Sequence, residues 1–143
     1  VRHESWNVPD TFEWLAERGI GFVNLDQPLF RRSIRPSARV TSHVAYVRVH
    51  GRNYSDWFRK DAGRDARYDY LYDGSELRPW VQRTREVAAQ PETESVDVVF
   101  NNHYRGKAVV NAIQFRTLLE GRRIAPPPSL ESAYPAELPS GGP

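Results

Sequence analysis

Apolar and polar residues follow one another along the chain in two kinds of pattern, which predict short strands and longer helices in turn. Strands are predicted where β-branched and aromatic residues alternate with polar ones, and helices where apolar residues recur every three to four positions. The predicted strands cover residues 20–26, 44–50 and 95–102, and the predicted helices cover residues 8–19, 76–90 and 106–119. A strand end at residues 1–4 precedes all of them.

Proline and glycine mark several of the predicted boundaries. Pro9 opens the first helix, Gly19 closes it, and Gly121 ends the last helix. Ser75 is placed to cap the second helix, and Pro79 would then be tolerable because first-turn amides lack intrahelical partners. Residues 27–43 and 51–74 show no clear period, so we expect them to be connections without regular structure.

Strands that alternate with helices predict an α/β protein with a parallel sheet covered by helices. Such a sheet is either open and doubly wound or closed into a (β/α) barrel, and the spacing of the elements does not choose between them. A complete barrel needs about 250 residues. The 143 residues of this chain would therefore make about half of one.

The formal charge is only +2, and almost all of the positively charged residues are arginines. Arginine is interleaved with aspartate and glutamate, as in residues 56–69, which is typical of a solvated surface rather than of a basic stripe that follows nucleic acid. Nucleic acid is therefore the less favoured partner. The chain has no cysteine and no apolar run of the roughly 20 residues that span a membrane, so we expect no membrane partner and a cytoplasmic location.

The two ends of the chain suggest a piece of a larger domain. The sequence begins with Val1, already inside an apolar pattern, and residues 122–143 are rich in proline, which predicts a disordered tail. A partial sheet exposes the edge of a parallel strand, and exposed edges pair with other chains. We therefore expect the isolated fragment to self-associate.

Five motifs carry a resemblance to a known family: VRHESW, GFVNLDQP, YVRVHGRN, YDYLYDGSELRPWVQRTREVA and VVFNNHYRGKAVVNAIQFRTLL. Through them residues 1–121 resemble the C-terminal half of the YecE-like family, the domain of unknown function numbered 72. The resemblance implies a TIM-type barrel, of which this chain supplies the end of the fifth strand through the eighth strand and its helix. The N-terminal half of the domain would then be absent. The resemblance implies no reaction, because the activity of the family is not established.

Side-chain parity predicts which polar groups face the interior of such a barrel. Ala45, Val47 and Val49 suit the helix-covered outside, which turns the alternate residues of that strand inward. The same count gives the inward set Arg2 and Glu4, Asn24 and Asp26, Tyr46, Arg48 and His50, and Asp97, Val99 and Asn101. These groups converge at the C-terminal mouth, where barrel enzymes keep their active sites.

The leading hypothesis is an enzyme, of hydrolase or isomerase type, that acts by acid–base or hydrolytic chemistry on a small anionic or polyhydroxy substrate. His50 and Asp26 are its candidates for proton transfer, because imidazole and carboxylate are common general acids and bases. The candidates for substrate binding are Arg2, Arg48, Arg52, Asn101, Asn102 and Gly106.

Structural roles compete with each of these assignments. Arg48 could only balance Asp26, Asp97 or Glu4, and His50 could be a buried imidazole bonded to the backbone. The two asparagines could tie down a turn, and the aromatic residues of the 51–74 connection could pack beneath a helix rather than cover a ligand. The alternative functions are a noncatalytic module that binds a phosphorylated ligand or nucleic acid, and a scaffold whose polar interior is structural.

No cofactor motif is evident, and binding of a divalent metal remains an open alternative. Residue types that bind metals lie near the mouth: His3, Glu4, Asp26, His50 and His103. The arginines beside them would repel a cation.

The segment NNHYRGKA, residues 101–108, is predicted to be a strand-to-helix turn that binds an anion. Helix N-termini carry unpaired amides and the positive end of the helix dipole, and Gly106 would let a ligand approach the backbone. The alternative is that Arg105 and Lys107 are solvated and that Gly106 only eases the turn.

Overall fold

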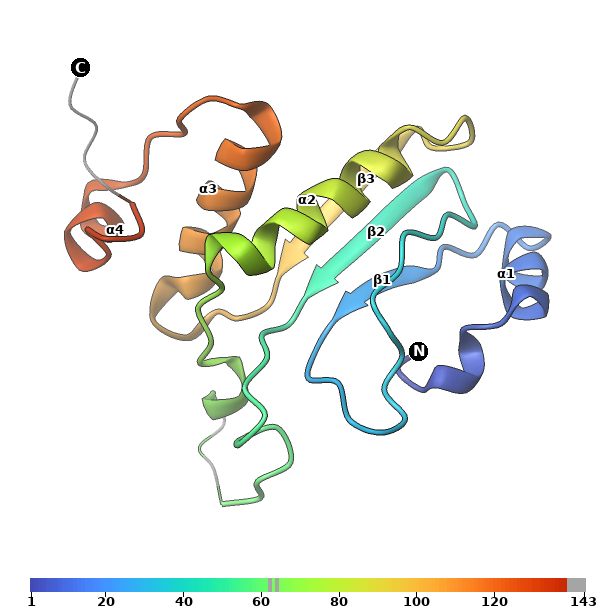
Figure 1. Ribbon diagram of the computed structural model, residues 1–143, viewed down its shortest axis with the longest axis horizontal. Coiled ribbons are helices and arrows are strands. Elements are labelled where there is room, and N and C mark those ends of the chain that lie inside the picture. The colour runs from blue at the N-terminus through green and yellow to red at the C-terminus, as the bar shows by residue number, and fades with distance from the viewer. Residues whose placement is uncertain (62, 64, 139–143) are drawn as a thin grey trace.

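Three parallel strands form the centre of the computed structural model, which describes residues 1–61, 63 and 65–138. They are β1 (Val23–Asp26), β2 (Val44–Val49) and β3 (Ser95–Phe100), and they lie side by side in that order. All three run in the same direction, so their carboxyl ends and the segments that follow them lie at one end of the sheet (Figure 1). The predicted α/β class with a parallel sheet is confirmed at this level.

Helices precede β1 and follow β2 and β3, whereas residues 27–43 join β1 to β2 without a helix, as the sequence predicts. The helices are α1 (Pro9–Ala16), α2 (Gly74–Ala88), α3 (Lys107–Glu120) and α4 (Pro128–Ala133), and short 3-10 turns cover Glu4–Trp6, Ala66–Tyr68 and Tyr104–Gly106. Pro9 stands in the first turn of α1, and Gly121 caps α3 in the left-handed conformation with φ 67°. These boundaries confirm the predicted ones, because proline fits a first turn and glycine adopts positive φ without strain.

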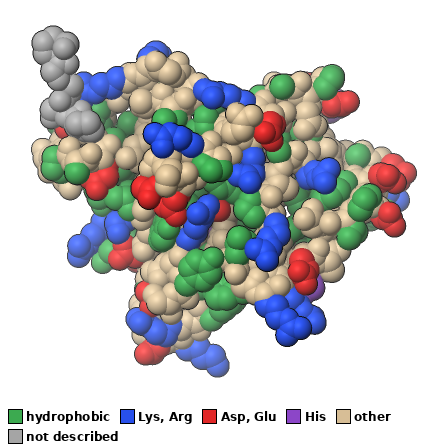
Figure 2. Space-filling view, in the orientation of Figure 1, with side chains coloured by type: hydrophobic (Ala, Val, Ile, Leu, Met, Phe, Trp, Pro, Cys, Tyr) green, Lys and Arg blue, Asp and Glu red, His purple; other side chains and the backbone are tan. Residues whose placement is uncertain are grey.

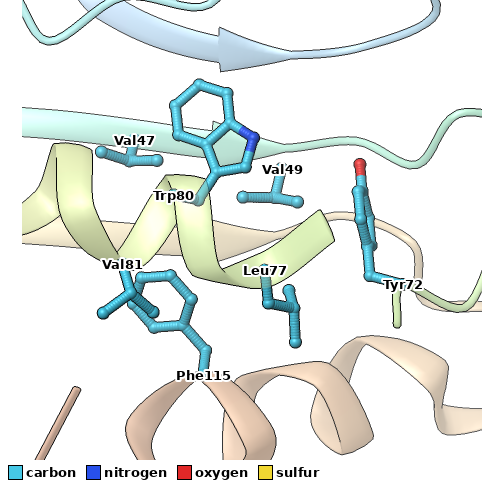
Figure 3. Packing of buried hydrophobic residues seen from close by; sticks show 7 residues of the cluster. All are labelled: Val47, Val49, Tyr72, Leu77, Trp80, Val81 and Phe115. Atoms are coloured by element: carbon cyan, nitrogen blue, oxygen red, sulfur yellow. The ribbon is translucent and has the colours of Figure 1, made fainter. Parts of the chain in front are cut away.

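The main hydrophobic core lies between the sheet and α2 with α3, which cover one of its faces (Figure 1). Val47 and Val49 point into it from β2, and Trp80 and Leu77 meet them from α2 without any exposed surface. Tyr72 stands beside Val49 and Leu77 at the edge of this cluster (Figure 3). Each such side chain contributes about 1.5–3 kcal/mol by burial, so this cluster holds α2 on the sheet.

The cap of α2 differs from the prediction. Asp73, not Ser75, is the N-cap: its carboxylate accepts from the amides of Ser75 and Glu76, while the Glu76 side chain accepts from the amide of Asp73. This reciprocal capping box satisfies more unpaired amides than a single serine could. The helix consequently starts earlier, and Pro79 lies beyond the first turn, where the packed apolar side of α2 offsets its cost of about 3 kcal/mol.

The N-terminal segment is not part of the parallel sheet, although a strand end was predicted there. His3 forms an isolated antiparallel bridge with Ser33, flanked by hydrogen bonds from the Ile34 amide to the Arg2 carbonyl and from the Glu4 amide to the Arg32 carbonyl. This bridge ties the start of the chain to the connection that follows β1. It thereby brings Arg2 to the carboxyl ends of the strands.

The segment after Gly121 contains α4 where the sequence predicts a disordered tail. Leu138 is buried, and the Gln114 side chain of α3 donates to the carbonyl of Glu137 at 3.1 Å. Residues 122–138 therefore have apolar and polar contacts with the rest of the protein, which could not be predicted from their proline content. Residues 139–143, the end of the predicted tail, lie outside the described part of the chain.

On the face shown in Figure 2, Lys and Arg side chains alternate with Asp and Glu, which fits the interleaving seen in the sequence. None of the helices in the described residues is both long enough and apolar enough to cross a membrane.

Candidate functional site

Strand register decides which polar groups share a face of the sheet. Arg48 of β2 stands between Leu25 of β1 and Val99 of β3, and adjacent partners in a parallel sheet point to the same side. Arg48 therefore lies on the face opposite to Val47 and Val49, as predicted. Asp26 pairs with Val49 instead, which places it on the helix-covered face.

The prediction that Asn24 and Asp26 face the same side as Arg48 is wrong. Asn24 pairs with Val47, and its side-chain oxygen accepts from the Arg39 amide and the Ser37 hydroxyl, both at 2.8 Å. The local pattern of residues does not reveal these directions because Leu25, the residue between the two, is buried as well. A strand with both sides buried shows no alternation from which parity could be counted.

On the face opposite α2 and α3, His50 is the centre of a polar cluster that we call the inner cluster: Arg2, Gln27, Arg48, His50, Trp57 and Asn101. The Arg2 guanidinium lies 3.0 Å from His50 Nε2 and donates to Gln27 Oε1 at 3.3 Å. The side-chain amide of Asn101 lies 3.3 Å from His50 Nδ1. The buried Trp57 ring stands edge-on to the imidazole with 6.0 Å between ring centroids.

The surroundings of His50 keep it neutral. The side chain is 2% exposed, and burial, together with the charges of Arg2 and Arg48, lowers the pKa of His50 from 6.5 to about 3. A guanidinium can only donate, so His50 Nε2 offers its lone pair to Arg2 and the ring proton sits on Nδ1. The Asn101 atom that lies 3.3 Å from Nδ1 is the amide nitrogen, and two donors cannot share this contact, so a proton on Nδ1 requires the amide to turn its oxygen toward the ring.

The two arginines of the inner cluster have no carboxylate partner. Within the described residues, Arg2 bonds only to His50 and Gln27, and Arg48 forms no ion pair, while its buried Nε has no hydrogen-bond partner. Burial and the nearby charge of Arg48 lower the pKa of Arg2. The alternative in which Arg48 balances Asp26, Asp97 or Glu4 is therefore not what this structure contains. Two guanidiniums without a carboxylate partner, one on exposed Arg2 and one on partly buried Arg48, attract an anion.

A cavity of about 660 Å³ opens beside Arg2. Its lining carries both signs of charge. Gln27 and Trp57 line it together with Phe30, Phe58, Arg32, Arg59, Lys60, Arg67 and the carboxylate of Asp56, which lies 2.9 Å from Arg59. Its volume is that of a small-molecule site. His50 does not line this cavity directly and meets it through Arg2.

On the helix-covered face, Asp26 belongs to a second polar group that we call the carboxylate network: Asp26, Arg52, Tyr70, Tyr72 and Glu76. Arg52 donates to the Asp26 carboxylate through Nε and NH2 at 3.0 Å and to Glu76 at 3.2 Å. The Tyr72 hydroxyl donates to Asp26, and the Tyr70 hydroxyl donates to Glu76 at 2.6 Å.

The charges of this network stabilise one another. Burial would lower the pKa of Arg52, but the hydrogen bonds and charge of Asp26 outweigh burial and raise it above its ordinary value. Burial and then the charge of Asp26 also raise the pKa of Tyr72. The phenol is thus a firm donor to the carboxylate at every pH at which the protein is handled.

Asn101 of the predicted turn at residues 101–108 belongs to the inner cluster, whereas residues 103–108 belong to neither group. Lys107 is paired with Asp69, and a Cβ added at Gly106 would lie 3.0 Å from Leu130 of α4, so that glycine packs against protein. Asn102 is fully buried, where it donates to the Tyr70 carbonyl and to Asn111 of α3. Anion binding at this turn stays a prediction.

The structure thus gathers half of the residues proposed from sequence. Arg2, Arg48, His50 and Asn101 meet in the inner cluster, whereas Asp26 and Arg52 join the carboxylate network. Sequence reasoning missed Gln27, which directly follows β1, and the role of Tyr72. It weighed Trp57 only as one of several loop aromatics, and of these Tyr72 packs beneath α2 while Trp57 covers the inner cluster.

The predicted gathering of metal-binding residue types is not found. In the described part of the chain, no three His, Asp or Glu side chains lie close enough together to hold a metal ion. His3 bonds to Ser5, and His103 lies 3.5 Å from Asp65 and stacks on Tyr68.

Comparison with known proteins places the chain among proteins without an assigned activity. The model of a family described as "Protein of unknown function DUF72" matches residues 1–134. The UPF0759 protein YunF of Bacillus subtilis (strain 168) is 32% identical over 128 residues, which cover 83% of this chain and 45% of that protein.

Two solved structures of DUF72 proteins are similar in fold. The protein TM1631 of Thermotoga maritima MSB8 is 39% identical with a TM-score of 0.74, and the match covers 83% of this chain and 44% of that one. The protein EF0366 of Enterococcus faecalis V583 is 28% identical with a TM-score of 0.72, over 84% and 46% of the two chains. The present chain therefore spans less than half the length of these relatives.

Proposed function

The chain belongs to the family described as protein of unknown function DUF72, and on this premise we propose that it binds a small anionic ligand at the inner cluster. One observation carries the proposal: Arg2 and Arg48 meet a buried neutral His50 without any carboxylate partner in the described residues. A bound anion would supply exposed Arg2 and partly buried Arg48 with the counter-charge that the described residues do not provide.

The ligand would be held by groups of three kinds. The guanidiniums of Arg2 and Arg48 supply charge and directed donors, which suit the oxygens of phosphate, sulfate or a carboxylate. Asn101 and Gln27 supply amides that can turn toward hydroxyl groups. Trp57 offers a flat apolar wall. This set fits an anion attached to a polar or polyhydroxy body, in keeping with the substrate class suggested by the sequence.

We propose further that these three strands belong to a TIM-type barrel completed by chain that is not part of this sequence. The parallel order of the strands and the alternating helices support this arrangement. The inner cluster would then line the C-terminal mouth, where barrel enzymes keep their active sites. Residues from the other half would add to the site.

The reaction, if the site is catalytic, would involve His50 rather than Asp26. In the ligand-free cluster the pKa of His50 is too low for a proton acceptor at neutral pH. A bound anion would raise that pKa and allow His50 to exchange a proton with the ligand. Asp26 is directed to the other face and is bonded to Arg52 and Tyr72. The alternative, a noncatalytic module for phosphorylated ligands or nucleic acid, uses the same cations.

A sulfate titration tests the proposal. Sulfate stays dianionic over the usable pH range, and its binding is measured by calorimetry on the wild type, Arg2→Met and Arg116→Met. Arg116 is exposed on α3 in an ion pair with Glu120, which makes it the matched control for the loss of one surface charge. We expect Arg2→Met to weaken sulfate binding about tenfold or more, as for a charge-assisted hydrogen bond, and Arg116→Met to change it less than twofold. Equal weakening in both variants would show that only general charge is sensed, and the proposal would fail.

A further inference from the structure

The three residues that follow β2, His50, Gly51 and Arg52, are connected to Asp26 either directly or through Tyr72. The His50 amide donates to the Asp26 carbonyl at 3.0 Å. The Gly51 amide donates to the Tyr72 hydroxyl at 2.8 Å, and this hydroxyl in turn donates to the Asp26 carboxylate. The Arg52 guanidinium binds the same carboxylate through two nitrogens.

The peptide between His50 and Gly51 is thereby fixed from the helix-covered face. Gly51 has φ 96°, a left-handed conformation that residues with a Cβ rarely adopt. A Cβ at this position would lie 3.0 Å from the Cβ of Tyr70 and 3.5 Å from that of Asn102. The backbone thus turns in a confined space directly after His50, and the Tyr72 hydroxyl is the group that holds its amide.

From this geometry we propose that Asp26 and Tyr72 are positioning residues, which set the orientation of the His50 ring through the Gly51 amide. The inference rests on the proposed anion site, since it names what prepares that site. It assigns Asp26 a role different from proton transfer: both carboxylate oxygens already accept from Arg52 or Tyr72, and neither reaches the inner cluster.

The orientation matters because His50 has two partners on opposite sides of its ring. Nε2 meets Arg2 and Nδ1 meets Asn101, at 3.0 and 3.3 Å. A rotation of the peptide that carries the ring would lengthen at least one of these hydrogen bonds. Arg2 has few other partners, so it would also lose its place beside Arg48.

The experiment compares Tyr72→Phe with Tyr70→Phe. Both variants remove one hydroxyl from the carboxylate network and keep the ring, but only the Tyr72 hydroxyl contacts Gly51. Three quantities are measured on each: sulfate affinity by calorimetry, the ¹⁵N shifts of the His50 imidazole by NMR, and the thermal midpoint.

We expect Tyr72→Phe to weaken sulfate binding about twofold to tenfold, the worth of one hydrogen bond, and to shift the His50 imidazole signals away from the pure Nδ1–H tautomer. Tyr70→Phe should leave both unchanged, even where it lowers the thermal midpoint. A Tyr72→Phe variant with lowered midpoint but unchanged affinity and imidazole shifts would overturn the inference, since its role would be structural alone. If the wild type binds no sulfate, the proposed function fails, and the imidazole shifts of the two variants still decide whether Tyr72 orients His50.

Discussion

At the carboxyl ends of the same strands, the charged groups on the two faces of the sheet have different partners. Beneath α2, the Asp26 carboxylate is surrounded by donors from Arg52 and Tyr72, and Glu76 accepts from Arg52 and Tyr70. On the opposite face, the charges of Arg2 and Arg48 are alike, and the group between them is a neutral imidazole.

This difference distinguishes polar groups that hold the fold together from polar groups that could bind a ligand. Buried polar groups with all their partners hold elements together, and here they tie the end of β2 to the start of α2. The cations of the inner cluster, exposed Arg2 and partly buried Arg48, have no carboxylate partner in the described residues and do not hold elements together in this way. Loss of a charged group should therefore lower stability strongly in the carboxylate network and change it only slightly in the inner cluster.

Asp26→Leu should have the largest effect on stability. The change leaves the Arg52 guanidinium and the Tyr72 hydroxyl without their acceptor inside the fold, and breaking a buried pair in this way costs about 3–5 kcal/mol. Arg52 is 29% exposed at its side chain, so water recovers part of that cost and we expect the lower end of this range. Urea denaturation measures the change in the free energy of unfolding. A decrease in the free energy of unfolding below about 1 kcal/mol would mean that the network does not hold the fold together.

Acid should destabilise the protein through His50, with an effect of intermediate size. The pKa of His50 is 6.5 in an unfolded chain and about 3 in the fold, so between these values the unfolded chain binds a proton that the folded chain does not. The stability due to the neutral ring is complete above pH 6.5 and is lost as the pH falls toward 3, with a slope of at most about 1.4 kcal/mol per pH unit.

The variant His50→Gln isolates this contribution, because glutamine does not titrate and keeps a polar side chain. Urea midpoints of both proteins are measured from pH 7 down to pH 4. We expect the free energy of unfolding of the wild type to fall more steeply than that of His50→Gln. Parallel curves would show that His50 is protonated as readily in the fold as outside it.

Arg48→Met should have the smallest effect on stability, within about 1 kcal/mol and of either sign. The change removes a half-buried charge that has no ion-pair partner in the described residues and keeps most of the apolar side chain. Its sulfate affinity should nevertheless fall as that of Arg2→Met does. A loss of stability as large as that of Asp26→Leu would erase the contrast between the two faces.

The order of elements and the helix-facing side of β2 could be predicted from sequence because one periodic signal dominates each. Val47 and Val49 alternate with polar residues, and a single covered face produces that pattern. In β1 the buried residues Asn24, Leu25 and Asp26 are consecutive, so register with β2 alone decides the faces. Register depends on hydrogen bonds between segments about 20 residues apart, which local pattern does not encode.

The residue types of the site could be predicted from sequence, but the way in which these residues divide into two groups could not. The cations and imidazole at the strand ends could be named from sequence because parallel strands end together. Their division into a balanced network and an unbalanced cluster depends on Tyr72, which reaches Asp26 from a connection 46 residues later in the chain. A tyrosine in a long irregular connection carries no sequence signal for such a contact.

Titration of the His50 imidazole by NMR, with and without sulfate, tests most directly whether the inner cluster is an anion site. We expect a pKa of about 3 in the sulfate-free protein, because burial and the two arginines disfavour the charged ring. Sulfate should raise that pKa, since it offsets the charges of Arg2 and Arg48, and sulfate affinity should accordingly increase as the pH falls. A pKa near 6.5 in the sulfate-free protein, or one that millimolar sulfate leaves unchanged, would contradict the claim that the inner cluster is an anion site.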